Sequence, residues 1–175
     1  MMEFNCFEPI IDSKSKVLIL GTMPGEASIK AKEYYAHTDN LFWDIIFRIC
    51  IQSWKMEELV IADYDSKVQL LYDNNIAVWD VLQFCNRKGS LDKDILNQIQ
   101  NDFNLFLKQN SQIKAIFFNG KKAFEYFENQ KLSKSILNNI KLITLPSTSP
   151  SNTKNSFYIL KEWLQIRKFL NEEIL

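Results

Sequence analysis

One short segment of the sequence concentrates side chains that can bind a flat ring system and act on it. Residues 34–43 read Tyr-Tyr-Ala-His-Thr-Asp-Asn-Leu-Phe-Trp, which places four aromatic rings, one histidine and one asparagine within ten residues. A tyrosine face such as that of Tyr35 stabilises a stacked base by ~1–3 kcal/mol. The amide of Asn40 can both donate to and accept from a base edge. Tyr35, His37 and Asn40 are therefore candidate binding or catalytic residues.

Two of these residues also have a structural interpretation. Asn40 precedes an apolar helical pattern, and asparagine is a preferred helix N-cap. His37 is the only histidine, so histidine-rich metal sites are excluded, and any Ser-His or Cys-His catalysis must use this residue. A hydrogen-bonded structural histidine is the more common case. Both interpretations stay open at the level of sequence.

Two loops complete the set of candidate residues. The first runs through Gly21, Thr22, Met23, Pro24 and Gly25, where two glycines allow close backbone approach to a ligand and the proline fixes one dihedral angle. It matches neither GxGxxG nor GxxxxGK[ST], which disfavours a nucleotide cofactor. The second loop offers hydroxyl groups and prolines suited to phosphate contacts or insertion into a duplex, although such runs are usually plain loops; its residues are Ser147, Thr148, Ser149, Pro150, Ser151 and Asn152.

The elements that must position these loops alternate between strands and helices. Short apolar runs predict strands at residues 17–20, 76–81, 113–118 and 141–145. Apolar spacings of three and four predict helices at residues 40–51, from Ser90 to about Asn110, after Gly120, and at 156–170. This order predicts an α/β fold, a three-layer αβα sandwich with a central, mainly parallel four-stranded sheet. In such sheets ligands bind at the carboxyl ends of the strands, where both loops begin.

Composition limits the classes of protein that the chain can represent. A length of 175 residues with 46% apolar content predicts one domain over 1–175. No leader or membrane-spanning run is readable, so we expect a soluble, cytoplasmic protein. The three cysteines lie far apart, which favours reduced thiols. The net charge is zero, but it is unevenly distributed. Residues 1–107 carry 10 basic and 16 acidic side chains, whereas residues 108–175 carry 11 basic and 5 acidic ones. The lysines of the second part can form a basic face or can simply be a solvated surface.

Taken together, the loops and the aromatic segment resemble the uracil-DNA glycosylase superfamily, and within it the hypoxanthine-DNA glycosylase branch, which is related to the mismatch-specific uracil-DNA glycosylases. The resemblance runs in the right order from about Val17 to Asn152. It rests on Gly21–Gly25, Tyr35-Ala-His, Asn40-x-Phe-Trp43, Trp79-Asp-Val-Leu, Arg87-Lys-Gly-Ser-Leu-Asp92, Phe117-Phe-Asn-Gly120 and Leu145–Asn152.

The chain departs from the superfamily pattern at two positions. Many members place a water-activating Asn or Asp inside the first loop, where this chain has Met23, whose thioether cannot polarise water. The hypoxanthine branch is similar in this respect and relies on the asparagine that corresponds to Asn40. Thr38 stands where that branch usually has proline, which affects the geometry of the turn. Iron-sulfur members need four cysteines, and this chain has three.

The resemblance implies hydrolysis of the N-glycosidic bond of deaminated bases in double-stranded DNA, hypoxanthine first and uracil second, after the nucleotide is flipped out of the duplex. It implies Asn40 as the catalytic residue. The base-binding residues would be Gly21, Thr22, Met23, Pro24, Gly25, Tyr35 and His37, and Ser147–Asn152 would contact DNA. We expect no metal, no cofactor, no membrane and a monomer.

Two other functions are compatible with the same sequence. The first is a non-catalytic, damage-sensing DNA-binding protein on the same fold, which Met23 favours because the usual general base is missing. The second is a small-molecule hydrolase or transferase, which lacks a readable nucleophile-base pair because His37 has no evident serine or cysteine partner.

Overall fold

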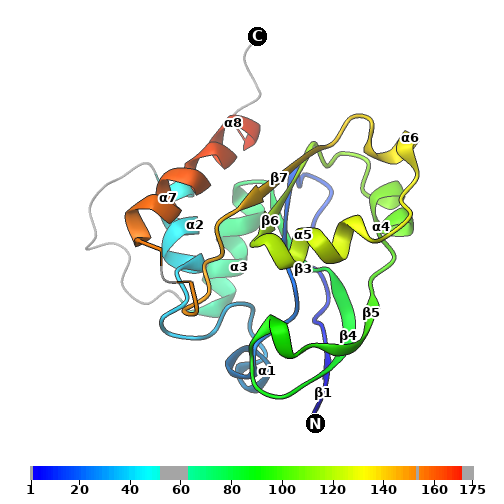
Figure 1. The fold of residues 1–175 in the computed structure, drawn as a ribbon. Helices are drawn as coiled ribbons and strands as arrows, with labels where there is room; N and C mark the ends of the chain where they lie inside the picture. Colours follow the sequence, from blue (N-terminus) through cyan, green and yellow to red (C-terminus); the bar gives the residue numbers. More distant parts are fainter. Residues whose placement is uncertain (1, 52–62, 153, 171–175) are drawn as a thin grey trace.

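The chain folds around a central sheet of four parallel strands. The computed structural model describes residues 2–51, 63–152 and 154–170. The strand order across the sheet is β3-β2-β6-β7 (Figure 1), with β2 at Val17–Gly21, β3 at Ile76–Asp80, β6 at Ala115–Asn119 and β7 at Lys141–Leu145. The predicted α/β fold with a parallel four-stranded sheet is confirmed.

Strand β2 is buried along its whole length because both faces of the sheet are covered. Alternate side chains of a strand point to opposite faces. Val17 and Ile19 accordingly belong to one hydrophobic core, and Leu18 and Leu20 belong to the other. This arrangement explains why the strand reads as a continuous apolar run rather than as an alternating pattern.

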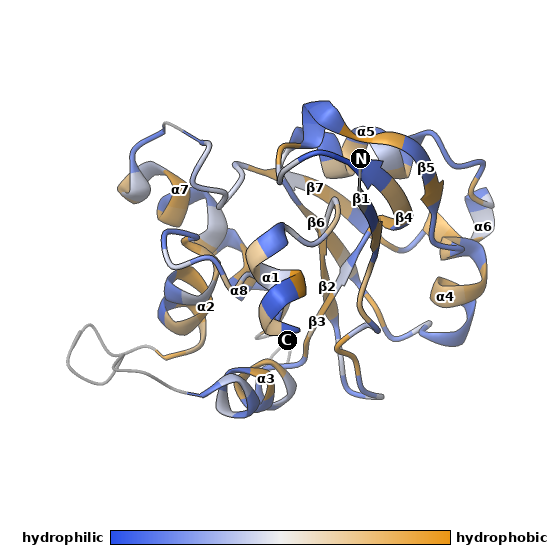
Figure 2. Cartoon of the chain, turned by 90° about the horizontal axis from the view of Figure 1, so that it is seen from below, coloured by the Kyte–Doolittle hydropathy of each residue, from blue (hydrophilic) through white to orange (hydrophobic). Residues whose placement is uncertain are grey.

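Helices form the two outer layers. One layer contains α2 (Phe42–Cys50), α3 (Tyr64–Asp73), α7 (Ser156–Trp163) and α8 (Arg167–Leu170); the other contains α4 (Phe103–Gln109), α5 (Lys121–Glu128) and α6 (Lys134–Leu137). A further short helix, α1 (Glu26–Ala31), follows the first loop. Figure 2 shows hydrophobic colouring along the central strands and mixed colouring on the helices, as expected for helices that bury one face.

The prediction of one helix from Ser90 to about Asn110 is wrong. This stretch contains the 3-10 turn η2 (Asp92–Asp94), strand β5 (Leu96–Gln100) and only then α4. Strand β5 pairs with β4 (Leu82–Arg87), which pairs with β1 (Met2–Asn5), and the three form a separate antiparallel sheet. The apolar residues at helical spacing across this stretch belong to different elements, and pairing with β4 determined their conformation.

The helical segment predicted at 156–170 is helical throughout, but it is not one uniform α-helix. It is divided into α7, the 3-10 turn η3 (Leu164–Ile166) and α8. The predicted apolar face was correctly identified, because Ile159 and Trp163 are buried in one core and Leu160, Leu164 and Leu170 pack against it. Among the described helices, none has the length and apolar character needed to cross a membrane.

The parallel arrangement brings four strand ends to one edge of the sheet. Strands β2, β3, β6 and β7 end at Gly21, Asp80, Asn119 and Leu145, respectively. Gly21 is the register partner of Asp80, and Asn119 is the register partner of Leu145. The loops that follow these four residues therefore meet above the same edge.

Candidate active site

A cavity of about 450 Å³ opens at the carboxyl ends of the parallel strands. Its walls include 13 of the 14 residues predicted as site residues: Gly21, Thr22, Met23, Pro24, Gly25, Tyr35, His37, Asn40, Ser147, Thr148, Ser149, Pro150 and Ser151. Asn152 is not part of the wall. Its side-chain nitrogen donates to the Ser147 carbonyl at 2.6 Å, so it closes the second loop from outside the cavity.

The first loop is held in place by contacts with η2 and β4. The Thr22 hydroxyl donates a hydrogen bond to Asp92 Oδ2 at 2.9 Å, and Arg87 donates to the Pro24 carbonyl. The guanidinium of Arg87 is fully buried and lies 3.8 Å from Asp92 Oδ1. Met23 is 7% exposed and packs in the hydrophobic core, so this loop presents backbone groups to the cavity.

Gly21 is required because two polar side chains approach its Cα. A Cβ atom at this position would lie 2.5 Å from Asp80 Oδ1 and 2.9 Å from the Tyr35 hydroxyl, closer than real Cβ contacts. The glycine therefore leaves space into which a carboxyl group and a phenol both point. Glycine is needed here because of these close contacts and not because of a turn, since the φ of Gly21 is not in the left-handed region.

Tyr35 has a strained backbone and a fixed ring. Its φ is 55°, in the left-handed region that only a few per cent of non-glycine residues adopt. Its ring stacks on Phe42 with centroids 3.8 Å apart and an interplanar angle of 17°. Phe42 covers one face of the ring, so a ligand in the cavity has access only to the other. Burial raises the pKa of the Tyr35 hydroxyl, which stays protonated.

Asn40 lies at the start of α2 and has a structural role there. Its side-chain oxygen accepts a hydrogen bond from the Phe42 N–H at 3.0 Å, although the residue immediately before the helix is Leu41. In the part of the chain that the structure describes, the side-chain nitrogen of Asn40 donates no hydrogen bond. The oxygen therefore supports the helix start, while the N–H₂ group is available to a ligand in the cavity.

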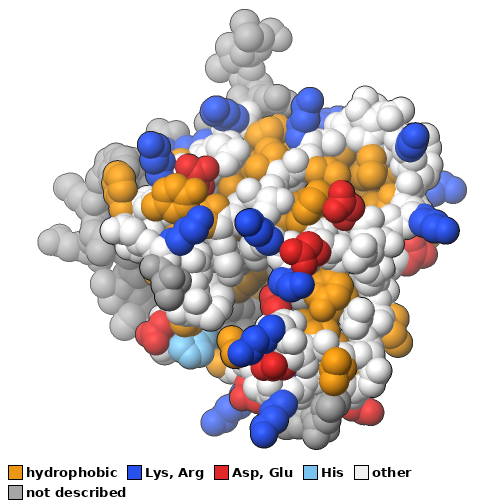
Figure 3. Space-filling model, in the orientation of Figure 1, with side chains coloured by type: hydrophobic (Ala, Val, Ile, Leu, Met, Phe, Trp, Pro, Cys, Tyr) orange, Lys and Arg blue, Asp and Glu red, His pale blue; other side chains and the backbone are white. Residues whose placement is uncertain are grey.

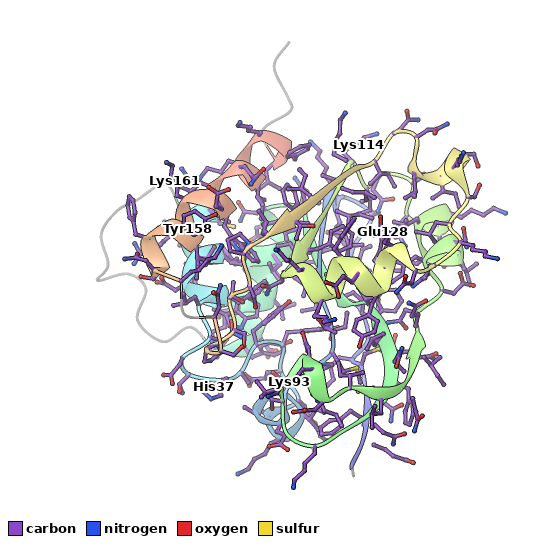
Figure 4. The ribbon with its side chains drawn as sticks, in the orientation of Figure 1. His37, Lys93, Lys114, Glu128, Tyr158 and Lys161 are labelled. Carbon is purple, nitrogen blue, oxygen red and sulfur yellow. The ribbon has the colours of Figure 1, made fainter. Side chains whose placement is uncertain are left out.

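His37 lies at the exposed rim of the site. Its Nδ1 accepts a hydrogen bond from the Asp39 N–H at 3.2 Å, and its carbonyl accepts from the Asn40 N–H at 2.9 Å. Figure 4 shows His37 and Lys93 at the same end of the molecule, on the segment before α2 and on η2. The histidine thus stabilises the turn and borders the entrance of the cavity.

The second loop is fastened to strand β6 by a reciprocal pair of hydrogen bonds. Asn119 Nδ2 donates to Thr148 Oγ1 and Thr148 N–H donates to Asn119 Oδ1, both at 2.9 Å. The Thr148 carbonyl accepts from the Leu41 N–H at 3.1 Å, which connects this loop to the segment that carries Asn40. The second loop and the aromatic segment are consequently joined where they line the cavity.

Asp80 is a polar residue of the cavity that sequence reasoning did not select as a site residue. It ends β3, is 2% exposed, and its Oδ2 has no hydrogen-bond partner among the described residues. Burial, reinforced by the negative charge of Asp92 and opposed by the Arg87 guanidinium, raises the pKa of Asp80 to about 8. An acidic residue at the end of a buried apolar strand, in Trp79-Asp-Val-Leu, was the signal that could have identified it.

Three lysine side chains lie along part of the cavity wall. Lys93, Lys121 and Lys122 line the cavity wall and are exposed, and Lys122 pairs with Glu125 at 2.6 Å. Figure 3 shows further Lys and Arg side chains spread over the face in view, with Asp and Glu side chains among them. Among the described residues, no group of three or more His, Cys, Asp or Glu side chains is arranged to hold a metal ion.

Comparison with known proteins identifies relatives over most of the chain. Residues 8–170 match the family model described as the uracil DNA glycosylase superfamily. A hypoxanthine DNA glycosylase of Methanosarcina barkeri is 35% identical over 120 residues, which cover 69% of this chain and 73% of the relative. A hypoxanthine DNA glycosylase of Methanosarcina acetivorans is 32% identical over 157 residues, 90% of this chain and 93% of the relative.

A solved structure agrees with these sequence matches. It is the solution NMR structure of a Methanosarcina acetivorans protein described as a candidate uracil DNA glycosylase, with a TM-score of 0.77 and 30% identity to this chain. The superposition covers 96% of this chain and 99% of the other.

Proposed function

Since the chain belongs to the uracil DNA glycosylase superfamily and is a DNA glycosylase, we propose that it hydrolyses the N-glycosidic bond of hypoxanthine, and secondarily of uracil, in double-stranded DNA. The observation that carries this proposal is the convergence of Tyr35, Asn40 and the Gly21–Gly25 backbone on one cavity at the strand ends. The cavity volume of about 450 Å³ lies within the range of small-molecule sites, about 300–1,000 Å³.

A base stacked inside a duplex cannot reach such a cavity, so the nucleotide must be flipped out of the helix. Flipping costs a few kcal/mol, and the cost is smallest for mismatched or damaged pairs. Deaminated bases pair poorly, which favours their entry over that of normal bases. The Ser149–Asn152 segment, in which Pro150 and Ser151 are exposed, would contact the bent backbone and fill the vacated space. Lys93, Lys121 and Lys122 would attract the phosphates.

Bond cleavage develops positive charge on the sugar and negative charge on the departing base. Tyr35 would stack on the base with the ring face that Phe42 leaves free, and His37 would border the base at the rim. Asn40 would use its free N–H₂ group to hydrogen-bond the base or to position water, while its oxygen holds the start of α2. Backbone amides of Gly21–Gly25 would stabilise charge, and the chemistry needs neither metal nor cofactor. We expect a cytoplasmic monomer.

One observation favours a second function. Met23 occupies the loop where a water-activating residue often stands in the superfamily, and its side chain is buried in the core. A protein that recognises damaged bases without releasing them would have the same features. The glycosylase proposal differs from it in a measurable product.

The test is a panel of end-labelled duplexes, each with a single hypoxanthine, uracil or xanthine, or with normal bases only. Incubation with the protein followed by alkali converts any abasic site into a strand break. Breaks at hypoxanthine in excess over the normal duplex support the glycosylase. Tight binding to the hypoxanthine duplex without breaks would establish the damage-sensing protein.

A further inference from the structure

The floor of the cavity holds two buried polar groups that the proposed function does not use. Asp80 Oδ2 and the Tyr35 hydroxyl are both buried, and neither has a hydrogen-bond partner among the described residues. Asp80 Oδ1 and the Tyr35 hydroxyl lie 2.5 Å and 2.9 Å from the point where a Cβ of Gly21 would stand. Buried polar groups without partners are rare in proteins and call for an explanation, such as a missing ligand.

The environment of Asp80 determines which ligand groups fit. Asp92 on η2 and Arg87 on β4 are the charged groups near Asp80, and their charges are opposite. The negative charge of ionised Asp80 in turn raises the pKa of the Tyr34 and Tyr35 hydroxyls and of the Cys6 thiol. Desolvation has the largest effect on the pKa of Asp80, and it raises this pKa so that the carboxyl group is neutral below about pH 8. A neutral carboxyl group donates one hydrogen bond and accepts others, so it can serve an acceptor atom of a base.

From this geometry we propose that Asp80 is the proton donor to the departing base. Its carboxylic O–H would hydrogen-bond a ring nitrogen or carbonyl oxygen of the flipped base and transfer its proton as the glycosidic bond breaks. This inference rests on the proposed glycosylase activity and adds the group that neutralises the leaving base. Asp80 is suited to this role because it lies in the cavity wall and its Oδ2 has no hydrogen-bond partner among the described residues.

The step is balanced in atoms and electrons. The bond between C1′ and the base nitrogen breaks, and its electron pair goes to the base, which takes the proton of Asp80 and leaves neutral. Water adds to C1′ and releases one proton, which restores the Asp80 carboxylic acid through solvent. The products are an abasic sugar and the free base, and no oxidant, reductant or metal takes part.

The experiment is single-turnover release of hypoxanthine from duplex DNA between pH 6 and pH 10. Wild-type protein should be fastest below about pH 8 and lose about tenfold in rate per pH unit above it, because only protonated Asp80 is competent. Asp80→Asn keeps the shape and a hydrogen-bond donor but has no proton to transfer. It should be slower by about 10²-fold near neutral pH, the low end of general-acid effects, and should lack the decline that begins near pH 8, so that only the substrate's own titration remains.

A second variant tests the same group without altering it. Asp92→Asn removes a negative charge that raises the pKa of Asp80, while its side-chain oxygen still accepts the Thr22 hydrogen bond. The alkaline decline should therefore move to lower pH. Asp94→Asn, an exposed carboxylate on the same turn, is the matched control and should leave the decline where it is.

These measurements separate the possible outcomes. Hypoxanthine itself loses a ring proton in the alkaline range, so a decline that persists unchanged in Asp80→Asn would belong to the substrate and overturn the inference. A wild-type rate that is flat to pH 10, an Asp80→Asn rate within twofold of wild type, or an unmoved decline in Asp92→Asn would each overturn it as well. No release by wild-type protein at any pH would instead refute the proposed function.

Discussion

Tyr35 stacks on Phe42 in nearly parallel geometry, with ring centroids 3.8 Å apart, while its buried hydroxyl has no hydrogen-bond partner among the described residues. The ring face and the hydroxyl of this residue therefore make separable contributions. Tyr35→Phe should keep most base release, and its melting temperature should not fall, because no hydrogen bond is lost.

Tyr35→Ala removes the stacking surface and should reduce single-turnover release of hypoxanthine by about 10–100-fold, which corresponds to ~1–3 kcal/mol of stacking. The comparison is valid only for folded protein, so circular dichroism melting accompanies the kinetics. An equal loss of activity in the Phe and Ala variants would assign the function to the hydroxyl.

Asn40 combines a cap-like hydrogen bond with a free amide nitrogen, and substitutions can separate the two roles. Asn40→Asp keeps the oxygen that accepts from the Phe42 N–H, so stability should be retained; Asn40→Ala should cost ~0.5–2 kcal/mol of unfolding free energy. Both variants should suppress hypoxanthine release. The Asp variant should lose at least about tenfold, because it places a negative charge where a donor is needed beside a leaving group that becomes negative. Normal release by a folded Asn40→Asp protein would remove Asn40 from the mechanism.

Gly21 should tolerate no side chain. Gly21→Ala places a Cβ 2.5 Å from Asp80 Oδ1 and 2.9 Å from the Tyr35 hydroxyl, so one or both side chains must move. We expect a lower melting temperature and a loss of base release of about tenfold or more. Gly25→Ala is the control in the same loop, since its Cβ would meet only the Ser90 side chain at 3.3 Å. Equal melting temperatures and equal rates of base release in the two variants would contradict the close contacts at Gly21.

The raised pKa of Asp80 predicts how stability varies with pH. The folded protein holds this proton up to about pH 8, whereas the unfolded chain releases it near the ordinary value of 3.8. The contribution of Asp80 to stability is therefore full below the unfolded value and is lost as pH rises toward 8. Asp80→Asn does not titrate, so its melting temperature relative to wild type should increase between pH 4 and pH 8 and then level off. A difference that stays constant across this range would show that Asp80 has an ordinary pKa.

Chelation should leave the reaction intact. The proposed chemistry uses a stacking ring, an amide, backbone N–H groups and a carboxylic acid, none of which needs a bound ion. Release of hypoxanthine in excess EDTA should match release without it, as measured by alkali-induced strand breaks. Recovery of activity only after addition of a divalent cation would require a different mechanism.

Local patterns in the sequence determined the central sheet and its edge. Buried runs such as Val17–Leu20 and Ala115–Phe118 were identified because parallel strands covered on both faces read as continuous apolar segments. The position of the site followed from topology, since parallel strands bring their carboxyl ends together. The loop residues were also apparent, because glycine, proline and hydroxyl side chains are concentrated there.

Only the tertiary structure decided which elements the ambiguous segments form and what each polar group contacts. Ile95 and Ile99 have helical spacing to Phe103, yet pairing with β4 makes Leu96–Gln100 a strand, because backbone hydrogen bonds with a distant segment outweigh a local pattern. The protonation state of Asp80 also depends on the tertiary structure. The sequence shows an acidic residue at the end of an apolar run, but its carboxyl group becomes a neutral acid only because the folded core removes it from water and brings the charge of Asp92 close to it.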